Sequence, residues 1–396
     1  MEKFIDIIWG FLNSTGIALF FAEGGWKYLV MIVLACILLF LAIKKKFEPY
    51  LLLPLAFSML LINLPGAKDE LFVKTLVEGT GVNGVASEYT YSGLFGYLYY
   101  GVKFGIYPCL IFLCIGATTD FGPLIANKKT MLLGAAAQGG IFITFIGAIL
   151  LGFNVLEASS IGIIGGADGP TAILVTSKMA PELLGSISIA AYSYMALVPV
   201  ILPPVIKLLT TKKERQIRME QVREVSKKER ILFPIIVALI VILIVPSCAP
   251  LIGCLMLGNL IKESGVVPKI TEVLSNSLLY IVTILLGTCV GATATAEAFL
   301  TLDTLLIFGL GIFAFDIAAA CGVLIGKLMC VLSKGKLNPM IGAAGVSAVP
   351  MAARVVQKVG KEEDPDNFLL MHAMGPNVAG VIGSAIAAGI LMLLFL

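Results

Sequence analysis

Gly165-Gly166-Ala167-Asp168-Gly169-Pro170-Thr171 places a carboxylate between helix-breaking residues, inside a stretch that is otherwise apolar. The glycines and the Gly-Pro pair interrupt helical hydrogen bonding, which frees backbone carbonyls to act as ligands. An ionised Asp at bilayer depth costs roughly 2.5 to 3.5 kcal/mol on insertion scales, so it is tolerated where it meets a cation, a proton or water. Because apolar segments lie on both sides of Asp168, we interpret it as the centre of a functional site rather than as an outer-loop residue.

The composition around this stretch predicts a polytopic membrane protein. Of the 396 residues, 59% are hydrophobic and 13% are charged, and the mean hydropathy of +1.00 is more than a water-soluble domain of this size carries. Apolar runs such as 26–43 and 130–152 are long and continuous, which indicates membrane helices rather than the short alternating segments of a barrel. The eight cysteines lie singly and the net charge is only +3, so neither a Cys-x-x-Cys site nor nucleic-acid binding is indicated.

Lysines and arginines at the ends of apolar runs predict the topology. Lys44-Lys45-Lys46, Asn127-Lys128-Lys129 and the basic stretch 210–230 mark cytoplasmic ends by the positive-inside rule. We therefore expect an all-α multi-pass protein of the cell (inner) membrane, with about ten or eleven spans. Residues 4–21 form either a first span or an interfacial helix.

Glycine, proline and charge divide the chain into parts. Segments 159–179 and 338–359 are too broken for ordinary spans, and we expect re-entrant hairpins there. Residues 246–262 are expected to form a short Pro- and Gly-rich return. The predicted parts are N-terminal spans with an outer loop (1–92), a first repeat with hairpin 159–179 (93–209), a cytoplasmic linker (210–230) and a second repeat with hairpin 338–359 (231–396).

Two short matches indicate an internal repeat of inverted topology. Ile164-Gly165-Gly166-Ala167 matches Ile341-Gly342-Ala343-Ala344 at an offset of 177 residues, and Gly116-Ala117-Thr118 matches Gly291-Ala292-Thr293 at an offset of 175. The flanking charges predict that the first Gly-Ala-Thr ends inside and the second outside. Inverted repeats whose broken segments meet near the midplane are typical of alternating-access carriers.

Polar side chains in and after the broken segments predict a cation site. Asn338 and Ser347 lie in the second hairpin, and Tyr192 and Tyr194 lie in the span after the first. Na⁺ prefers anionic and neutral oxygens. The Asp168 carboxylate, the Asn338 amide oxygen, the Ser347 and Tyr194 hydroxyls and freed carbonyls would supply them at one or two sites. Taken alone, an Asn or Ser in a membrane helix more often serves interhelical hydrogen bonding.

Arg354 is a permanently charged, fork-shaped donor in the second broken segment. It follows Ser347 by seven residues, two turns of a continuous helix, so the two would share one face. Its geometry suits a carboxylate, either Asp168 or an incoming substrate, and the alternative is an arginine that snorkels to the cytoplasmic interface. His372 could titrate near neutrality, but no acid lies near it in sequence, so we expect it to pack.

At these residues the chain resembles the β subunit of the biotin-dependent, sodium-pumping decarboxylases of oxaloacetate, methylmalonyl-CoA and glutaconyl-CoA. The resemblance runs from about residue 25 onward, and its most specific parts are 165–171 and 338–354. It implies that the functional residues, Na⁺ ligands among them, are Asp168, Tyr194, Asn338, Gly342, Ser347 and Arg354.

The resemblance also implies a mechanism. A biotinyl carrier would bring N-carboxybiotin to this chain, which would decarboxylate it and export Na⁺ while consuming a proton from the outer side. Arg354 would hold the carboxybiotin carboxylate at the cytoplasmic mouth, and Asp168 with Asn338 would bind one Na⁺. Tyr194 and Ser347 would serve a second Na⁺ and the proton route. The implied partners are the carrier, a carboxyltransferase α-subunit, a small membrane subunit of the γ/δ type and further copies of this chain.

The residues alone leave a second function open. A secondary transporter that couples Na⁺ or H⁺ to a carboxylate substrate would have the same composition and the same inverted repeats. Only the two specific motifs favour the decarboxylase pump over this transporter.

Overall fold

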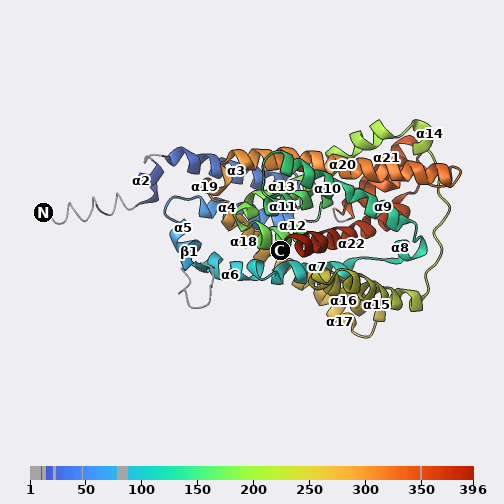
Figure 1. The fold of residues 1–396 in the computed structure, drawn as a ribbon, viewed down its shortest axis with the longest axis horizontal. Helices are drawn as coiled ribbons and strands as arrows, with labels where there is room; N and C mark the ends of the chain where they lie inside the picture. The colour runs from blue at the N-terminus through green and yellow to red at the C-terminus, as the bar shows by residue number, and fades with distance from the viewer. Residues whose placement is uncertain (1–9, 11–14, 21–23, 47, 78–87, 348–349) are drawn as a thin grey trace. The chain divides into compact units, whose positions relative to one another are not determined.

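The computed structural model describes residues 10, 15–20, 24–46, 48–77, 88–347 and 350–396, and nearly all of its regular structure is helical (Figure 1). The α-helices are α2 (Gly16–Phe20), α3 (Gly25–Lys44), α4 (Pro49–Ile62), α5 (Lys68–Leu71), α6 (Leu94–Lys103), α7 (Ile106–Thr118), α8 (Gly122–Ala126), α9 (Thr130–Ala137), α10 (Gly139–Leu150), α11 (Val155–Gly162), α12 (Gly169–Met179), α13 (Leu184–Leu209), α14 (Lys212–Arg215), α15 (Lys227–Ile244), α16 (Ala249–Ser264), α17 (Pro268–Val273), α18 (Leu279–Thr293), α19 (Ala296–Phe299), α20 (Leu302–Leu332), α21 (Met351–Glu363) and α22 (Leu370–Phe395). Short 3₁₀ segments are η1 (Ile163–Gly166), η2 (Pro181–Leu183), η3 (Pro246–Cys248) and η5 (Pro339–Gly345), and η4 (Leu274–Leu278) is a π-helix.

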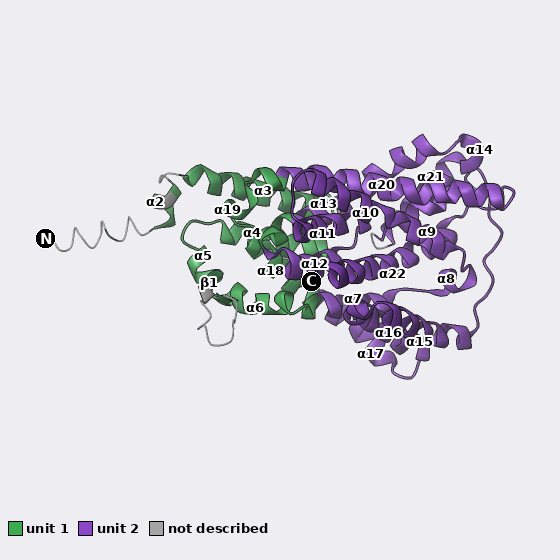
Figure 2. Cartoon of the chain, viewed as in Figure 1, with its two compact units in different colours: residues 1–107, 182–186, 281–304 green, residues 108–181, 187–280, 305–396 purple. Residues whose placement is uncertain are grey.

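The chain forms two compact units, which Figure 2 colours separately: unit 1 comprises residues 1–107, 182–186 and 281–304, and unit 2 the remainder. In unit 1, α3 packs on α4, and β1 (Val73–Val77) pairs antiparallel with β2 (Glu88–Ser92). This hairpin was not predicted from the sequence. Its β-branched and aromatic residues favour strands, and Tyr91 of β2 packs on the ring of Tyr99, with centroids 4.6 Å apart.

Helix α22 is the central helix of unit 2 (Figure 1). It packs against α8, α9, α12 and α21 and against the 3₁₀ segments η1 and η5. Glycines allow this close approach, because a Cβ on Gly380 would overlap the Gly345 carbonyl, and one on Gly134 of α9 would lie 2.7 Å from the Ala379 carbonyl carbon. Both predicted hairpin segments therefore lie against one apolar, glycine-rich helix.

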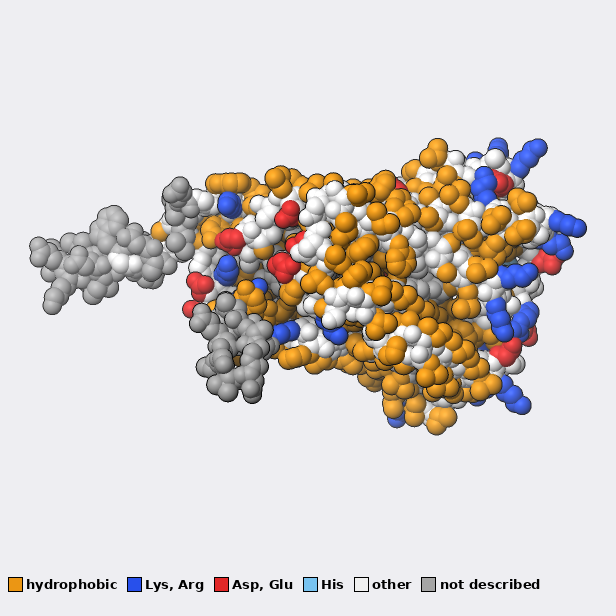
Figure 3. Space-filling model, in the orientation of Figure 1, with side chains coloured by type: hydrophobic (Ala, Val, Ile, Leu, Met, Phe, Trp, Pro, Cys, Tyr) orange, Lys and Arg blue, Asp and Glu red, His pale blue; other side chains and the backbone are white. Residues whose placement is uncertain are grey.

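Among the described residues, five helices are long and apolar enough to cross a membrane, or up to seven if two bent pairs count as spans. The ten or eleven spans expected from the sequence are therefore not confirmed. Some apolar helices are too short to count as spans, such as α4 with 14 residues. Helix α15 does not count as a span because it begins with the charged turn Lys227-Lys228-Glu229-Arg230. The sides of unit 2 carry exposed apolar residues such as Leu243 and Phe313, whereas Lys and Arg gather at the end that carries α14 and α21 (Figure 3).

Three segments of the chain complete the comparison with the sequence. The return expected at 246–262 is helical, because α16 is a helix of 16 residues with Pro250 in its first two positions, and it packs back on α15. The apolar segment 97–118 is interrupted between α6 and α7, where Gly105 has a φ of 72°. Residues 4–21 lie mostly outside the described residues, and α2 is their described helical part.

The proposed repeat has equivalent local structure in its two copies. Thr118 ends α7 and Thr293 ends α18. Within unit 2, a Cβ on Gly116 would overlap a backbone carbonyl of α16, and within unit 1 a Cβ on Gly291 would overlap one of α4. The hairpin matches also agree, since η1 and η5 are both 3₁₀ helices. These equivalences support the repeat that the sequence predicts.

Candidate cation site

Asp168 lies at a break between two helices of unit 2. Segment η1 ends at Gly166, Ala167 adopts the left-handed conformation with a φ of 51°, and Asp168 caps the N-terminus of α12. Pro170 is compatible with the first turn of α12 because the N–H that it lacks has no helical partner there. A non-glycine residue in the left-handed region is strained, and such strain clusters at functional sites.

The Asp168 carboxylate is buried, with 5% of the residue exposed. Its Oδ2 accepts a hydrogen bond of 2.7 Å from Ser384 Oγ of α22, and its Oδ1 accepts a long one of 3.4 Å from the Thr171 N–H. The hydroxyls of Thr171 and Ser347 also lie near this carboxylate, but neither has a partner in hydrogen-bonding geometry among the described residues. Since buried oxygens normally are hydrogen-bonded, their unused lone pairs make this group suitable for a cation.

The two broken segments meet at this carboxylate. Ser347, which follows η5, donates its backbone N–H to the carbonyl of Gly166 at 3.2 Å. The next residues, Ala348 and Val349, lie outside the described residues. The structure therefore brings Asp168 and Ser347 together, as the sequence predicts, and adds α22 as a third element.

Asn338 is not hydrogen-bonded to the Asp168 group. It caps η5, where its Oδ1 accepts from the Met340 N–H at 3.0 Å, and its Nδ2 donates to the carbonyls of Arg215 and Ile217 in the linker. Both N–H groups of its amide therefore hold the second broken segment to the linker, and one lone pair of its oxygen caps η5. The pairing of Asn338 with Asp168 expected from the sequence is not seen in these contacts.

Gly342 is a packing glycine in this structure. A Cβ on Gly342 would overlap the carbonyl of Gly322 on α20, and a Cβ on Gly322 would overlap the Gly342 carbonyl. Glycine is thus required at both positions because two backbones touch.

Of the two tyrosines, Tyr192 lies beside the Asp168 loop. A Cβ on Gly169 would overlap its ring and hydroxyl. Tyr194 instead donates its hydroxyl to the carbonyl of Phe308 on α20. Sequence reasoning named both tyrosines and the resemblance selected Tyr194, whereas the contacts place Tyr192 nearer to the loop.

Arg354 lies on an exposed face of α21. The expectation that it shares a helix face with Ser347 is wrong, because α21 begins only at Met351 and Ser347 precedes the break. Within the described part of the chain, no hydrogen bond or ion pair occupies the Arg354 guanidinium. It is a cation that remains available to a ligand.

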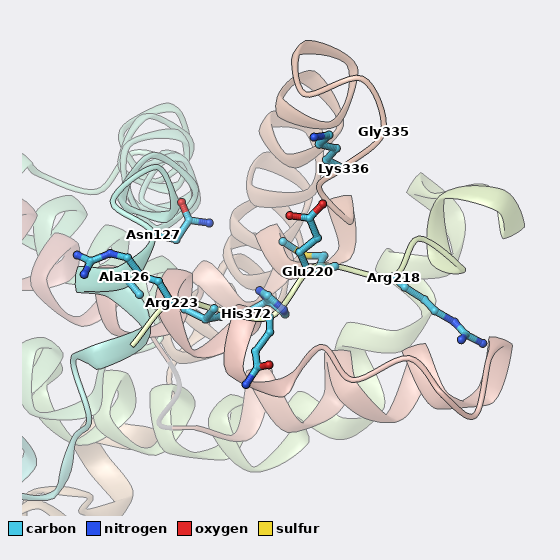
Figure 4. A pocket seen from close by; sticks show the side chains of 11 residues that line it. Ala126, Asn127, Arg218, Glu220, Arg223, Gly335, Lys336 and His372 are labelled. Carbon is cyan, nitrogen blue, oxygen red and sulfur yellow. The ribbon is translucent and has the colours of Figure 1, made fainter. Parts of the chain in front are cut away.

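A cavity of about 430 Å³ lies at the linker, with no residue of the Asp168 group in its lining (Figure 4). Linker residues 218–223 form one wall, and Asn127, Lys336 and His372 line it as well. His372, which we expected to pack, is half-buried there. Arg223 Nη2 lies 2.8 Å from Glu229 Oε1, and this contact holds the pKa of the Glu229 carboxyl at about 2. The linker wall is therefore anchored by an ion pair at neutral pH.

Ser384 is the residue of this group that sequence reasoning missed. It lies within Gly380 to Gly389 of α22, where every neighbour is small or apolar. The Ser384 hydroxyl also lies 3.0 Å from the Val381 carbonyl of its own helix. A single hydroxyl in such a helix has no periodic pattern that would separate a functional serine from one that bonds only its own helix.

Comparison with known proteins identifies the family. Residues 27–395 match the model of the Na⁺-transporting oxaloacetate decarboxylase beta subunit. The chain is 55% identical to the methylmalonyl-CoA decarboxylase subunit beta of Propionigenium modestum, covering 99% of this chain and 100% of that one. It is 53% identical to the glutaconyl-CoA decarboxylase subunit beta of Acidaminococcus fermentans, covering 99% and 98%. It is 51% identical to the oxaloacetate decarboxylase beta chain of Klebsiella pneumoniae, covering 92% and 94%.

These relatives agree with the resemblance that the two motifs suggested, and the apolar helices agree with a membrane protein. They make the chain a multi-pass membrane subunit of a decarboxylase complex, and they set aside the secondary transporter. The chain belongs to the family of Na⁺-transporting decarboxylase β subunits.

Proposed function

We propose that this chain decarboxylates N-carboxybiotin delivered by a biotinyl carrier, and that it couples this step to Na⁺ export with uptake of a proton. The observation that carries the proposal is the buried carboxylate of Asp168 where two broken segments meet α22, with the hydroxyls of Thr171 and Ser347 unbonded beside it. One carboxylate and several neutral oxygens match the charge and the ligand preference of Na⁺.

The position of the group explains how binding could be coupled to movement. Asp168 belongs to the first broken segment, Ser347 to the second and Ser384 to α22. A cation held by all three would fix the segments against one another, and its release would leave each free to shift. This is the arrangement expected where two repeats alternate access to one site. Asn338 then acts as an anchor of the second segment.

Arg354 is our candidate for holding the carboxybiotin carboxylate, because it is exposed on α21 and free of an ion pair with described residues. In the reaction, the bond between the biotin ring nitrogen and the carboxyl carbon breaks, CO₂ leaves and the ring nitrogen takes a proton. A guanidinium binds the planar carboxylate in two places and so orients this bond. The proton is the one that the pump consumes.

The subunits that would supply the substrate follow from this chemistry. N-Carboxybiotin requires a biotinyl carrier and a carboxyltransferase α-subunit that loads it. We further propose a small membrane subunit of the γ/δ type and several copies of this chain in the complex.

The test begins with a streptavidin blot of the complex purified gently through a tag on this chain, followed by assays of Na⁺-stimulated CO₂ release. Asp168→Asn should remove the Na⁺ dependence, and Arg354→Ala should raise the concentration of carboxybiotin carrier needed. Lys358→Ala is the matched control, because this cation is also exposed on α21. Full Na⁺-dependent decarboxylation in Asp168→Asn, or a preparation that retains other partners but no biotinylated protein, contradicts the proposal.

A further inference from the structure

A third interruption between two helices lies beside the two broken segments that meet at Asp168. Helix α9 ends at Ala137 and α10 begins at Gly139, so Gln138 interrupts the otherwise continuous apolar span 130–150. A polar side chain at an internal break of a membrane span requires a partner, as lipid offers none. Gln138 is buried, with 6% of the residue exposed.

The amide of Gln138 is held in one orientation. Its Nε2 donates to the carbonyl of Gly134 at 3.1 Å and to that of Gly380 at 3.3 Å. These two bonds identify the nitrogen, because the oxygen could not make them. Gln138 Oε1 is left without a hydrogen-bond partner among the described residues.

This oxygen borders Gly166, as does the serine that binds Asp168. The point that a Cβ on Gly166 would occupy is 3.1 Å from Ile141 Cδ1, 3.2 Å from the Cβ of Ser384 and 3.5 Å from Gln138 Oε1. Ser384 binds Asp168, and the carbonyl of Gly166 accepts from Ser347. Gln138 Oε1 and Ser384 therefore approach the same glycine, together with the methyl group of Ile141.

We infer that Gln138 is a further ligand of the cation that Asp168 binds, and that its Oε1 supplies a neutral oxygen from the first repeat. The inference rests on the proposed Na⁺ function of the Asp168 group. An amide oxygen fixed by two bonds from its own nitrogen is already oriented, so it binds a hard cation without rearranging. It adds no charge, so one carboxylate still balances one monovalent cation.

The test uses the complete complex and measures Na⁺ binding in two ways. The first readout is the rise of the melting temperature with NaCl at constant ionic strength, kept with choline chloride, since a cation that binds only the folded state raises it. The second is the Na⁺ concentration that gives half-maximal decarboxylation. Gln138→Met keeps the volume but removes the oxygen, and Gln138→Glu keeps an oxygen. Thr144→Val on α10 is the control, because it deletes another buried unbonded oxygen.

We expect Gln138→Met to raise the half-saturating Na⁺ concentration at least tenfold in both readouts, while Thr144→Val leaves it within twofold. Gln138→Glu loses the two bonds that orient the oxygen and adds a charge beside it, so it should change the half-saturating Na⁺ concentration at least threefold. A folded Gln138→Met protein with the half-saturating Na⁺ concentration of the wild type overturns the inference. If Gln138→Met does not fold, a folded Gln138→Glu protein with the half-saturating Na⁺ concentration of the wild type overturns it equally. A wild-type complex that shows no Na⁺ dependence in either readout contradicts the proposed function itself, which separates the two failures.

Discussion

Ser384 of the central helix donates a hydrogen bond of 2.7 Å to Oδ2 of Asp168, across 216 residues of sequence. The serine hydroxyl fixes one carboxylate oxygen, and the long contact from Thr171 leaves the other more open to a ligand. The orientation of the carboxylate is therefore set by α22 as well as by the cap of α12.

Ser384→Ala should raise the half-saturating Na⁺ concentration of decarboxylation by roughly tenfold, because a hydrogen bond to a charged group is worth about 1.5–3 kcal/mol. The measurement is a Na⁺ titration of CO₂ release. Ser160→Ala is the control, since this buried hydroxyl bonds the Leu156 carbonyl of its own helix and no other group that the structure describes. Equal Na⁺ dependence in the Ser384 variant and the wild type would show that the hydroxyl does not position the carboxylate.

Gly322→Ala should lower the yield of folded protein and its melting temperature, because a Cβ there would overlap the Gly342 carbonyl. Overpacking of this kind costs about 1–3 kcal/mol or more. Gly253→Ala in α16 is the matched change, since a Cβ at that glycine meets nothing within 4 Å. It should be neutral or stabilising, as alanine is the better helix former by about 1 kcal/mol. Thermal unfolding in detergent checks both, and equal melting temperatures for the two variants would contradict the close contact.

Asn338→Ala and Asn367→Ala should have similar effects, because both amides donate to the carbonyls of Arg215 and Ile217. Each change removes these two hydrogen bonds and should lower the free energy of unfolding by about 1–3 kcal/mol. The measurement is thermal unfolding with and without Na⁺. We expect both variants to keep the stabilisation by Na⁺. If only Asn338→Ala loses it, Asn338 is a Na⁺ ligand and not solely an anchor.

The linker should stay anchored between pH 8 and pH 5. Arg218 lowers the pKa of Asp364 and Arg223 holds that of Glu229 at about 2. A carboxyl with a depressed pKa contributes stability above its unfolded pKa, which is about 4 for Asp and Glu, and loses it as the pH falls toward the folded value. Hydrogen exchange of residues 216–226 should therefore be unchanged down to pH 5 after correction for the intrinsic rate. The exchange rate should increase in 1 M choline chloride, because the Debye length at this ionic strength is about 3 Å and the exposed ion pairs are then screened. Loosening at pH 6 would show that these pairs do not hold the linker.

Local rules explain why much of this protein could be predicted. Long apolar runs give membrane helices whatever their neighbours, and the glycines and proline around Asp168 break helical hydrogen bonds on their own. The same reasoning located the breaks before α12 and at η5. The number of spans that it gave is not confirmed, and it took Ser347 and Arg354 to lie on one helix, because helix ends depend on caps and on charged first turns as well as on apolar length.

The sequence by itself thus determined that the protein is an all-α membrane protein with a carboxylate where a helix is interrupted. Both features follow from composition and from backbone chemistry within a few residues. Only the tertiary structure decided which oxygens surround that carboxylate. Ser384 reaches it from a helix that is apolar nearly all round and carries no periodic polar face. Asn338 is drawn instead to the linker, whose free carbonyls accept its amide. Such contacts join residues far apart in the chain, and they are fixed by which glycines let two backbones approach, a property of packing that no local pattern records.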